Sequence, residues 1–180
     1  MKLQLFLFMF LLSVGSLSAQ ELYIPGKVTK GKDASYYCSS KFGVIHLLNV
    51  QNRDTTSIVY DKNGEVVDYI LSIYPSHPFK NYFVSSLKEI LTKEEWEELI
   101  EKNSFILLMF FLHDETGGIK EITFIFYDTN TVFMQLSPDR FNLLEQKLKQ
   151  NFKFDLTSEQ KNHKNPKSSF AIGSRDLIKL

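Results

Sequence analysis

The sequence predicts an α+β fold, built from antiparallel β-hairpins with two or three helices packed on one face. Three observations lead to this prediction. Two pairs of apolar runs are each joined by a short turn that contains glycine, at residues 61–64 and 114–118. Three other segments carry apolar residues at helical spacing. The 180 residues include 16 Phe and 8 Tyr, which are enough large apolar side chains for the single core that a chain of this length can bury.

The start of the chain predicts export. One basic residue, Lys2, precedes a mostly apolar run from Leu3 to Leu12, and small residues follow. This is the order of a secretory signal peptide, which we assign to residues 1–19. The run is shorter than the roughly 20 apolar residues that cross a bilayer, so we expect no transmembrane segment in the mature chain. Cleavage is expected after Ala19, with cleavage after the preceding serine as the alternative. The protein is then exported, and is either periplasmic or secreted.

The first half of the mature chain predicts one strand, one hairpin and one helix after a polar lead-in. Residues 21–37 are polar and broken by glycine and proline, so we expect a mobile lead-in that could hold one short strand. The β-branched and aliphatic run 42–50 predicts a strand. Apolar runs flank the Asn-Gly pair at 63–64, which readily adopts the positive φ angles of a hairpin turn. Apolar residues at helical spacing over 79–91 predict the first helix.

The second half predicts the order helix, strand, strand, helix, strand. Thr92 and Glu95 have the capping-box form of a helix start. The apolar runs 104–113 and 119–127 form the second hairpin around the turn that contains two glycines. A Ser-Pro pair at 137–138 opens the third helix, with serine as the N-cap and proline as the first helical residue.

Together these segments predict a single α+β domain at residues 20–156, which divides into two ββα halves, 42–91 and 92–156. Residues 151–156 are the last strand that we predict for it. The stretch 157–180 is polar and begins rich in lysine. We interpret it as a C-terminal tail that could add an edge strand near its end.

The run ILLMFFLHDETGGIKEITFIF is similar to the strand, acidic glycine turn and strand of TonB-like domains. With its flanking helices it makes residues 92–156 resemble the C-terminal domains of TonB and TolA, which are periplasmic adaptor domains. The resemblance lies in the order of the elements, and it implies a partner-binding role. The whole chain also looks like the small exported proteins of unknown function that are common in Gram-negative gut bacteria.

The stretch 112–121, LHDETGGIKE, places His113, Asp114 and Glu115 side by side, three residues that could bind a metal or move a proton. Aspartate accepts hydrogen bonds within its own turn and glycine supplies positive φ angles, so turn chemistry alone accounts for the stretch. A zinc site needs three or four converging ligands, whereas His113 and Asp114 alternate to opposite faces of a strand. We therefore predict the crest of a hairpin, and keep His113 and Asp114 only as candidate metal ligands.

Cys38 is the only cysteine, so no disulfide can form within the chain. Cys38 and His46 could form a nucleophile–base pair, because such pairs meet in space rather than in sequence. The interpretation that we favour is a thiol that packs as a small apolar group. His46, which alternates with aliphatic neighbours in a strand, is expected on a half-exposed face.

The net charge gives no electrostatic case for nucleic acid or for an anionic membrane. Removing residues 1–19 takes away one cation, Lys2, and no acid, which leaves 20 Lys and Arg against 21 Asp and Glu. Nucleic-acid-binding surfaces need clustered positive charge. Neither of the common glycine motifs that bind phosphate occurs in the sequence. We therefore expect no nucleic-acid partner and no cofactor.

The sequence favours an exported, non-catalytic binding or structural module of the cell envelope, with an envelope protein as its partner. Two alternatives stay open. One is a hydrolase or thiol enzyme that uses Cys38 and His46, and the other is an inhibitor of an enzyme.

Overall fold

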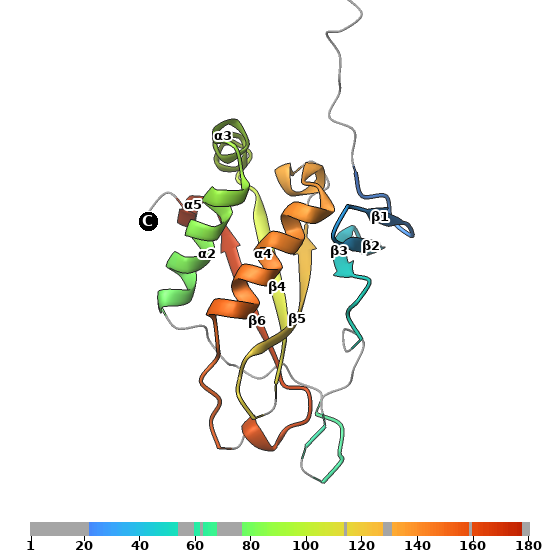
Figure 1. The fold of residues 1–180 in the computed structure, drawn as a ribbon, viewed down its shortest axis with the longest axis vertical. Coiled ribbons are helices and arrows are strands. Elements are labelled where there is room, and N and C mark those ends of the chain that lie inside the picture. The colour runs from blue at the N-terminus through green and yellow to red at the C-terminus, as the bar shows by residue number, and fades with distance from the viewer. Residues whose placement is uncertain are drawn as a thin grey trace, which may run out of the picture.

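A six-stranded antiparallel sheet carries helices α2 and α4 on one of its faces (Figure 1). The computed structural model describes residues 22–53, 60–61, 63–67, 77–113, 115–127, 131–158 and 160–177. The strand order is β1-β2-β3-β5-β4-β6, so strands from both predicted halves share one sheet and the predicted α+β class is confirmed. The elements are β1 (Val28–Lys30), β2 (Ser35–Lys41), β3 (Val44–Asn49), α2 (His77–Ile90), α3 (Lys93–Glu101), β4 (Phe105–Leu112), β5 (Ile119–Phe126), η1 (Val132–Gln135), α4 (Pro138–Asn151), η2 (Gln160–Asn162), β6 (Lys167–Gly173) and α5 (Ser174–Leu177).

The N-terminal segment belongs to the sheet, so the prediction of a mobile lead-in was wrong. β2 pairs with β1 on one side and with β3 on the other. Tyr36 and Cys38 of β2 are fully buried, although the segment is polar overall. Distant contacts hold it in place. The Tyr23 hydroxyl donates a 2.8 Å hydrogen bond to the Leu136 carbonyl oxygen, and the Asp139 carboxylate accepts two backbone amides of the β1–β2 turn.

The hairpin predicted around the double-glycine turn is formed by β4 and β5, and is confirmed. The two strands pair from Ile106 opposite Phe126 to Leu112 opposite Ile119. The face of β5 that carries Glu121 and Thr123 is covered, since these polar residues are only 6% and 5% exposed. The Glu121 carboxylate accepts a 2.6 Å hydrogen bond from the backbone amide of Arg53. The segment that follows β3 therefore lies over this end of β5.

The two long helices bury their predicted apolar faces against the sheet. Phe79 of α2 contacts the rings of Phe110 on β4 and Phe170 on β6. Phe141 of α4 contacts the rings of Tyr36 on β2 and Phe124 on β5. Aromatic side chains therefore join the helix layer to the sheet across most of its width, which accounts for the high Phe content.

The caps of α3 and α4 follow the sequence signals closely. The Thr92 hydroxyl accepts the Glu95 amide at 3.2 Å and the Glu95 carboxylate accepts the Thr92 amide at 2.7 Å, which confirms the predicted capping box. Ser137 and Pro138 are the N-cap and first residue of α4, as predicted. The Ser137 side chain, however, makes no capping hydrogen bond.

The stretch 151–156, predicted as the last strand, does not form one. Within it, Lys153 makes only an isolated bridge with Gly118. Phe154 is buried and packs against Phe79, so the apolar pattern of the stretch reflects core packing. The strand that follows α4 is β6, which lies within the predicted tail and pairs with β4 at the sheet edge.

The predicted turn at 61–64 is present. Gly64 has a φ of 83°, and Tyr60 forms an antiparallel bridge with Val66 across the turn. Much of the apolar runs that flank this turn falls outside the described residues. Within the described ranges, no helix is both long enough and apolar enough to cross a membrane.

Candidate functional site

The face of the sheet turned away from α2 and α4, here called the helix-free face, is unusually apolar. Antiparallel sheets that are covered on one face normally present polar side chains on the other. Here the register places Tyr37 opposite Leu48 and Leu107 opposite Ile125, and strand alternation turns all four away from the helices. The residues that alternation assigns to the central part of this face are Val28, Tyr37, Ser39, His46, Leu48, Leu107, Met109, Thr123, Ile125, Ser169 and Ala171.

Three exposed aromatic residues, which we call the aromatic row, lie at one end of the sheet. They are Phe42, Phe105 and Tyr127, with 94%, 39% and 57% of their surface exposed. The rings of Phe105 and Tyr127 meet edge to face, with centroids 5.5 Å apart. Large side chains of this kind are normally placed in cores, and a group of them in contact with solvent is typical of an interaction surface.

The strand register places all three residues of the aromatic row at the same end of the sheet. Phe126 on β5 pairs with Ile45 on β3 and with Ile106 on β4. One residue further toward this end of the sheet lie Tyr127, immediately after β5, and Phe105, the first residue of β4. At the same end β3 begins, immediately after the β2–β3 turn that carries the third aromatic residue. The row therefore runs across four strands, along the edge where β4 starts and β5 ends.

Phe42 is held in a backbone conformation that its side chain disfavours. Its φ is 53° and that of Gly43 is 80°, so both central residues of this two-residue turn have positive φ. Asn-Gly is the preferred pair in such turns, because a bulky L-residue in the left-handed region costs on the order of 1–2 kcal/mol. The ammonium of Lys41 lies 5.6 Å from the Phe42 ring centroid, and otherwise the ring faces solvent.

His46 lies on the helix-free face, where it pairs with Ser39 of β2 and Ile125 of β5. It is half-buried, which agrees with the expectation from the sequence. Burial, and secondarily the charge of Lys41, lowers the pKa of His46. The imidazole is therefore neutral at neutral pH, and it can donate one hydrogen bond and accept another.

Cys38 points the other way. It pairs with Leu47, shares the core face with Tyr36 and is fully buried. Burial raises the pKa of the Cys38 thiol, which favours the unreactive thiol over the thiolate. His46 lies on the opposite face of the sheet, so the structure does not bring this candidate nucleophile and base together.

His113 lies exposed at the end of β4. Its backbone closes the β4–β5 turn, because its amide donates to the Gly118 oxygen and its oxygen accepts the Gly117 amide, both at 2.9 Å. Asp114 lies outside the described residues. In the part of the chain that the structure describes, no three His, Cys, Asp or Glu side chains gather closely enough to hold a metal ion.

The sequence pattern does not single out the aromatic row. Part of the signal was available, because Phe42-Gly43 stands between two strand-forming runs at a place where Asn-Gly or Asp-Gly is usual. Phe105 and Tyr127 carried no such signal. Whether an aromatic residue at a strand end is covered depends on the strand order, which the sequence pattern does not contain.

Comparison with known proteins places the fold. No protein-family model matches the sequence, and no curated protein matches it either. The crystal structure of a DUF5043 family protein from Bacteroides uniformis is similar, with a TM-score of 0.73 and 19% sequence identity over 88% of this chain and 90% of that chain. At this level of identity, the likeness establishes that the two proteins share an α+β fold.

Proposed function

We propose that this protein is an exported, non-catalytic binding module of the cell envelope, and that it holds a protein partner through the aromatic row. The observation that carries the proposal is Phe42. Its backbone is strained, which lowers the stability of the isolated chain, and its ring is 94% exposed, so burial of the ring within the chain does not offset that cost. Local strain of this kind persists mainly at functional sites.

The composition of the row suits a protein partner. Aromatic side chains are enriched at the centres of protein interfaces, and they lose little conformational entropy on binding because they have few rotatable bonds. The half-buried apolar residues of the helix-free face, such as Leu107 and Met109, continue the surface toward the middle of the sheet. The contact can therefore extend beyond three rings.

The geometry of the candidate catalytic residues supports binding over catalysis. A thiol enzyme needs its base within hydrogen-bond reach of the sulfur, whereas Cys38 and His46 face opposite sides of the sheet. An enzyme inhibitor remains a special case of the proposal, in which the partner is itself an enzyme. The identity of the partner decides between an adaptor and an inhibitor.

Site-specific photo-crosslinking in intact cells tests the proposal. A benzophenone amino acid replaces Phe42 in one variant, Tyr127 in a second and Leu143 in a third. Leu143 is the matched control, because it is 47% exposed but lies on α4, in the helix layer. We expect the first two variants to crosslink the same envelope protein and the third not to. Adducts that are equal at all three positions, or absent from both row positions, would refute the proposal.

Phe42→Asn separates binding from folding. Asparagine tolerates the left-handed conformation, so the free energy of unfolding should stay the same or rise by about 1 kcal/mol. Capture of the partner should fall by roughly tenfold or more, as expected for an aromatic residue at the centre of an interface. Leu143→Asn should leave capture unchanged. Full capture by the Phe42→Asn variant would remove the main support for the proposal.

Export has its own test. N-terminal sequencing of the protein from fractionated cells should find a mature chain that begins at Gln20, or at Ala19 if cleavage follows Ser18. A cytoplasmic chain that still begins at Met1 would contradict export, and would leave the binding experiment to be interpreted separately.

A further inference from the structure

Two adjoining hollows lie at the opposite end of the sheet from the aromatic row. One, of about 540 Å³, is lined by His113, Glu115, Thr116, Lys120, Lys164 and Asn165. The other, of about 600 Å³, is lined by Tyr60, Asp61, Gly64, Lys161, Asn162, His163 and Lys164. Lys164 lines both. Figure 1 shows that the β4–β5 turn, the short hairpin of residues 60–67 and the loop before β6 meet at the lower end of the molecule.

Main-chain pairing holds these three segments together. The β4–β6 pairing ends where the Leu112 amide donates a 2.9 Å hydrogen bond to the Pro166 oxygen. His113, the next residue after β4, therefore lies beside Lys164 and Asn165, which come just before β6. On the far side, the Lys164 amide donates a 2.8 Å hydrogen bond to the Tyr60 oxygen. The backbone of Lys164 is therefore held by Tyr60, two residues before the bond that joins this loop to β4, while the Lys164 side chain is exposed.

Cations and neutral donors dominate the lining. Among the described residues of the lining there are three lysines, Lys120, Lys161 and Lys164, and two acids, Asp61 and Glu115. The carboxylate of Asp61 is occupied by its own turn. It accepts hydrogen bonds from the backbone amides of Asn63 and Glu65, both at 2.8 Å, and from the side-chain amide of Asn63 at 3.2 Å.

We infer that Lys164 and the hollows that flank it bind a small organic anion, one that carries a carboxylate or a phosphate group. Lysine is a compact charge with three donors and binds both groups. Asn165, Thr116 and His113 add side chains that can donate hydrogen bonds and so orient a polar ligand. Hollows of this volume match the usual size of small-molecule sites. The inference does not depend on the proposed protein partner, because it concerns different residues at the other end of the sheet.

Amide NMR titration of the purified chain tests the inference at constant ionic strength. Inorganic phosphate and citrate are the anionic probes, galactose is the neutral control and chloride is the ionic control. We expect saturable shift changes at the amides of His113, Lys161, Lys164 and Asn165 with phosphate, citrate or both. Saturation with only one probe identifies the group that is recognised. The absence of saturable changes with both anions, or equal changes with chloride, would overturn the inference.

Lys164→Gln shows whether the Lys164 side chain binds the anion. The substitution should weaken binding of whichever probe saturates, phosphate or citrate, by roughly tenfold, the size expected for one charged hydrogen bond. Lys93→Gln is the control, because that side chain is 82% exposed on α3 and makes the same change in net charge. Equal weakening in both variants would mean that only overall charge matters, and would overturn the site. The amide spectra themselves report whether either variant has lost the fold.

Discussion

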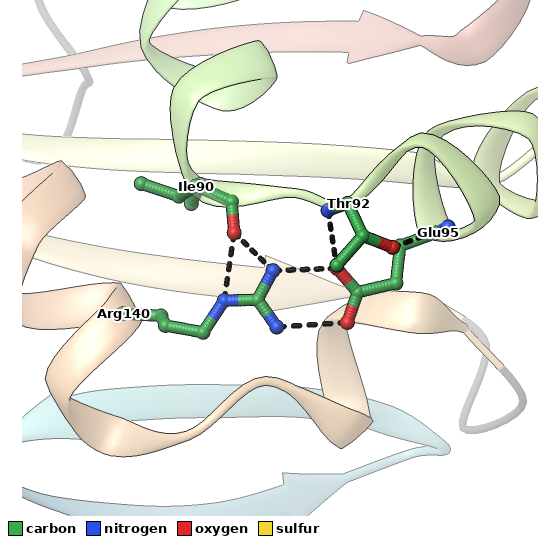
Figure 2. A network of polar contacts seen from close by, with 4 residues as sticks. All are labelled: Ile90, Thr92, Glu95 and Arg140. Carbon is green, nitrogen blue, oxygen red and sulfur yellow. Dashed lines mark hydrogen bonds and ion pairs between the residues drawn. The ribbon is translucent and has the colours of Figure 1, made fainter.

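The guanidinium of Arg140 on α4 bonds both carboxylate oxygens of Glu95 on α3, at 2.7 and 2.5 Å (Figure 2). The same guanidinium donates from Nε to the carbonyl oxygen of Ile90, the last residue of α2, at 2.7 Å. Glu95 in turn caps α3 through the amide of Thr92. Arg140 therefore donates directly to a carbonyl at the C-terminus of α2 and holds, through Glu95, the cap at the N-terminus of α3, so it fixes the corner between α2 and α3 against α4.

Arg140→Lys should destabilise the protein although it keeps the charge. Lysine cannot reach two carboxylate oxygens and a carbonyl in the plane that guanidinium provides, so the Ile90 oxygen or Glu95 loses a charged donor. We expect the free energy of unfolding to fall by about 1–3 kcal/mol, measured by urea denaturation. Lys147→Gln is the control, since it removes an ion pair with the more exposed Glu89 and should cost less than about 1 kcal/mol. Equal losses would contradict the structural role of Arg140.

The same ion pair predicts a loss of stability in acid. The hydrogen bond from Arg140 is the main cause that lowers the pKa of Glu95. Because the folded-state pKa lies below the unfolded one, the stabilisation is present above the ordinary glutamate pKa and is lost as pH falls through the folded-state value. Glu95→Gln keeps the capping acceptor but removes the charge. The difference in unfolding free energy between wild type and Glu95→Gln should therefore shrink between about pH 7 and about pH 3. A difference independent of pH would refute the assignment.

A buried carboxylate joins α4 to the N-terminal strands. Glu145 is fully buried. Its Oε2 accepts the Tyr36 hydroxyl at 2.7 Å and the Asn49 side-chain amide at 3.2 Å, and its Oε1 lies 2.6 Å from the ammonium of Lys149. Tyr36→Phe should cost about 1–3 kcal/mol, because it leaves a buried charge short of one donor. Tyr82→Phe is the control, since that hydroxyl donates to a helix carbonyl in a half-buried place. It should cost less.

Glu145→Leu tests whether the two groups act as a unit. Alone, it leaves the Tyr36 hydroxyl buried without an acceptor, while the double variant with Tyr36→Phe removes both polar groups. We expect the double variant to lose less stability than the sum of the two single losses, with a coupling of about 0.5–3 kcal/mol in a double-mutant cycle. Additive losses would show that the hydrogen bond contributes nothing beyond burial of its partners.

The elements that the sequence predicted well are those specified by neighbours along the chain. The Thr92–Glu95 capping box, the double-glycine turn and the helical spacing around Phe79 and Phe141 all depend on residues within one or two turns. The structure confirms each of them. The α+β class follows from the same local patterns, because hairpins and amphipathic helices must bury their apolar faces against each other.

The predictions that were wrong depended on contacts between residues far apart in the sequence. β2 looked polar because its buried side chains, Tyr36 and Cys38, alternate with exposed ones, and because the contacts that order Tyr36 come from α4, over 100 residues away. Residues 151–156 looked like a strand because their Phe side chains alternate, yet they fill the core beside α2. The aromatic row was missed for a related reason. Whether these side chains are exposed depends on the order of the strands in the sheet, which local sequence patterns do not specify.

Gly117 is a position where the backbone requires glycine twice over. Its φ is 66°, and a Cβ placed there would lie 2.0 Å from the Phe154 carbonyl oxygen. Gly26 has a similar φ of 82° but nothing within 4 Å of the added atom. We expect Gly26→Ala to cost about 1 kcal/mol of backbone strain. Gly117→Ala should lower the free energy of unfolding by about 3 kcal/mol or more, because the β4–β5 turn must move away from the Phe154 backbone. Equal midpoints in thermal unfolding would refute the close approach.

Cys38 should be inert in the folded protein. Alkylation by iodoacetamide requires the thiolate, and burial both raises the pKa of this thiol and blocks the approach of the reagent. We expect the folded chain near neutral pH to react far more slowly than free cysteine, and to reach the free-cysteine rate once urea unfolds it. Mass spectrometry follows the adduct, and a Cys38→Ala variant gives the background. A folded-state rate above that of free cysteine would need an activating base near the sulfur. His46 cannot supply one from the opposite face of the sheet, so that result would contradict the placement of β2 and reopen the thiol-enzyme alternative.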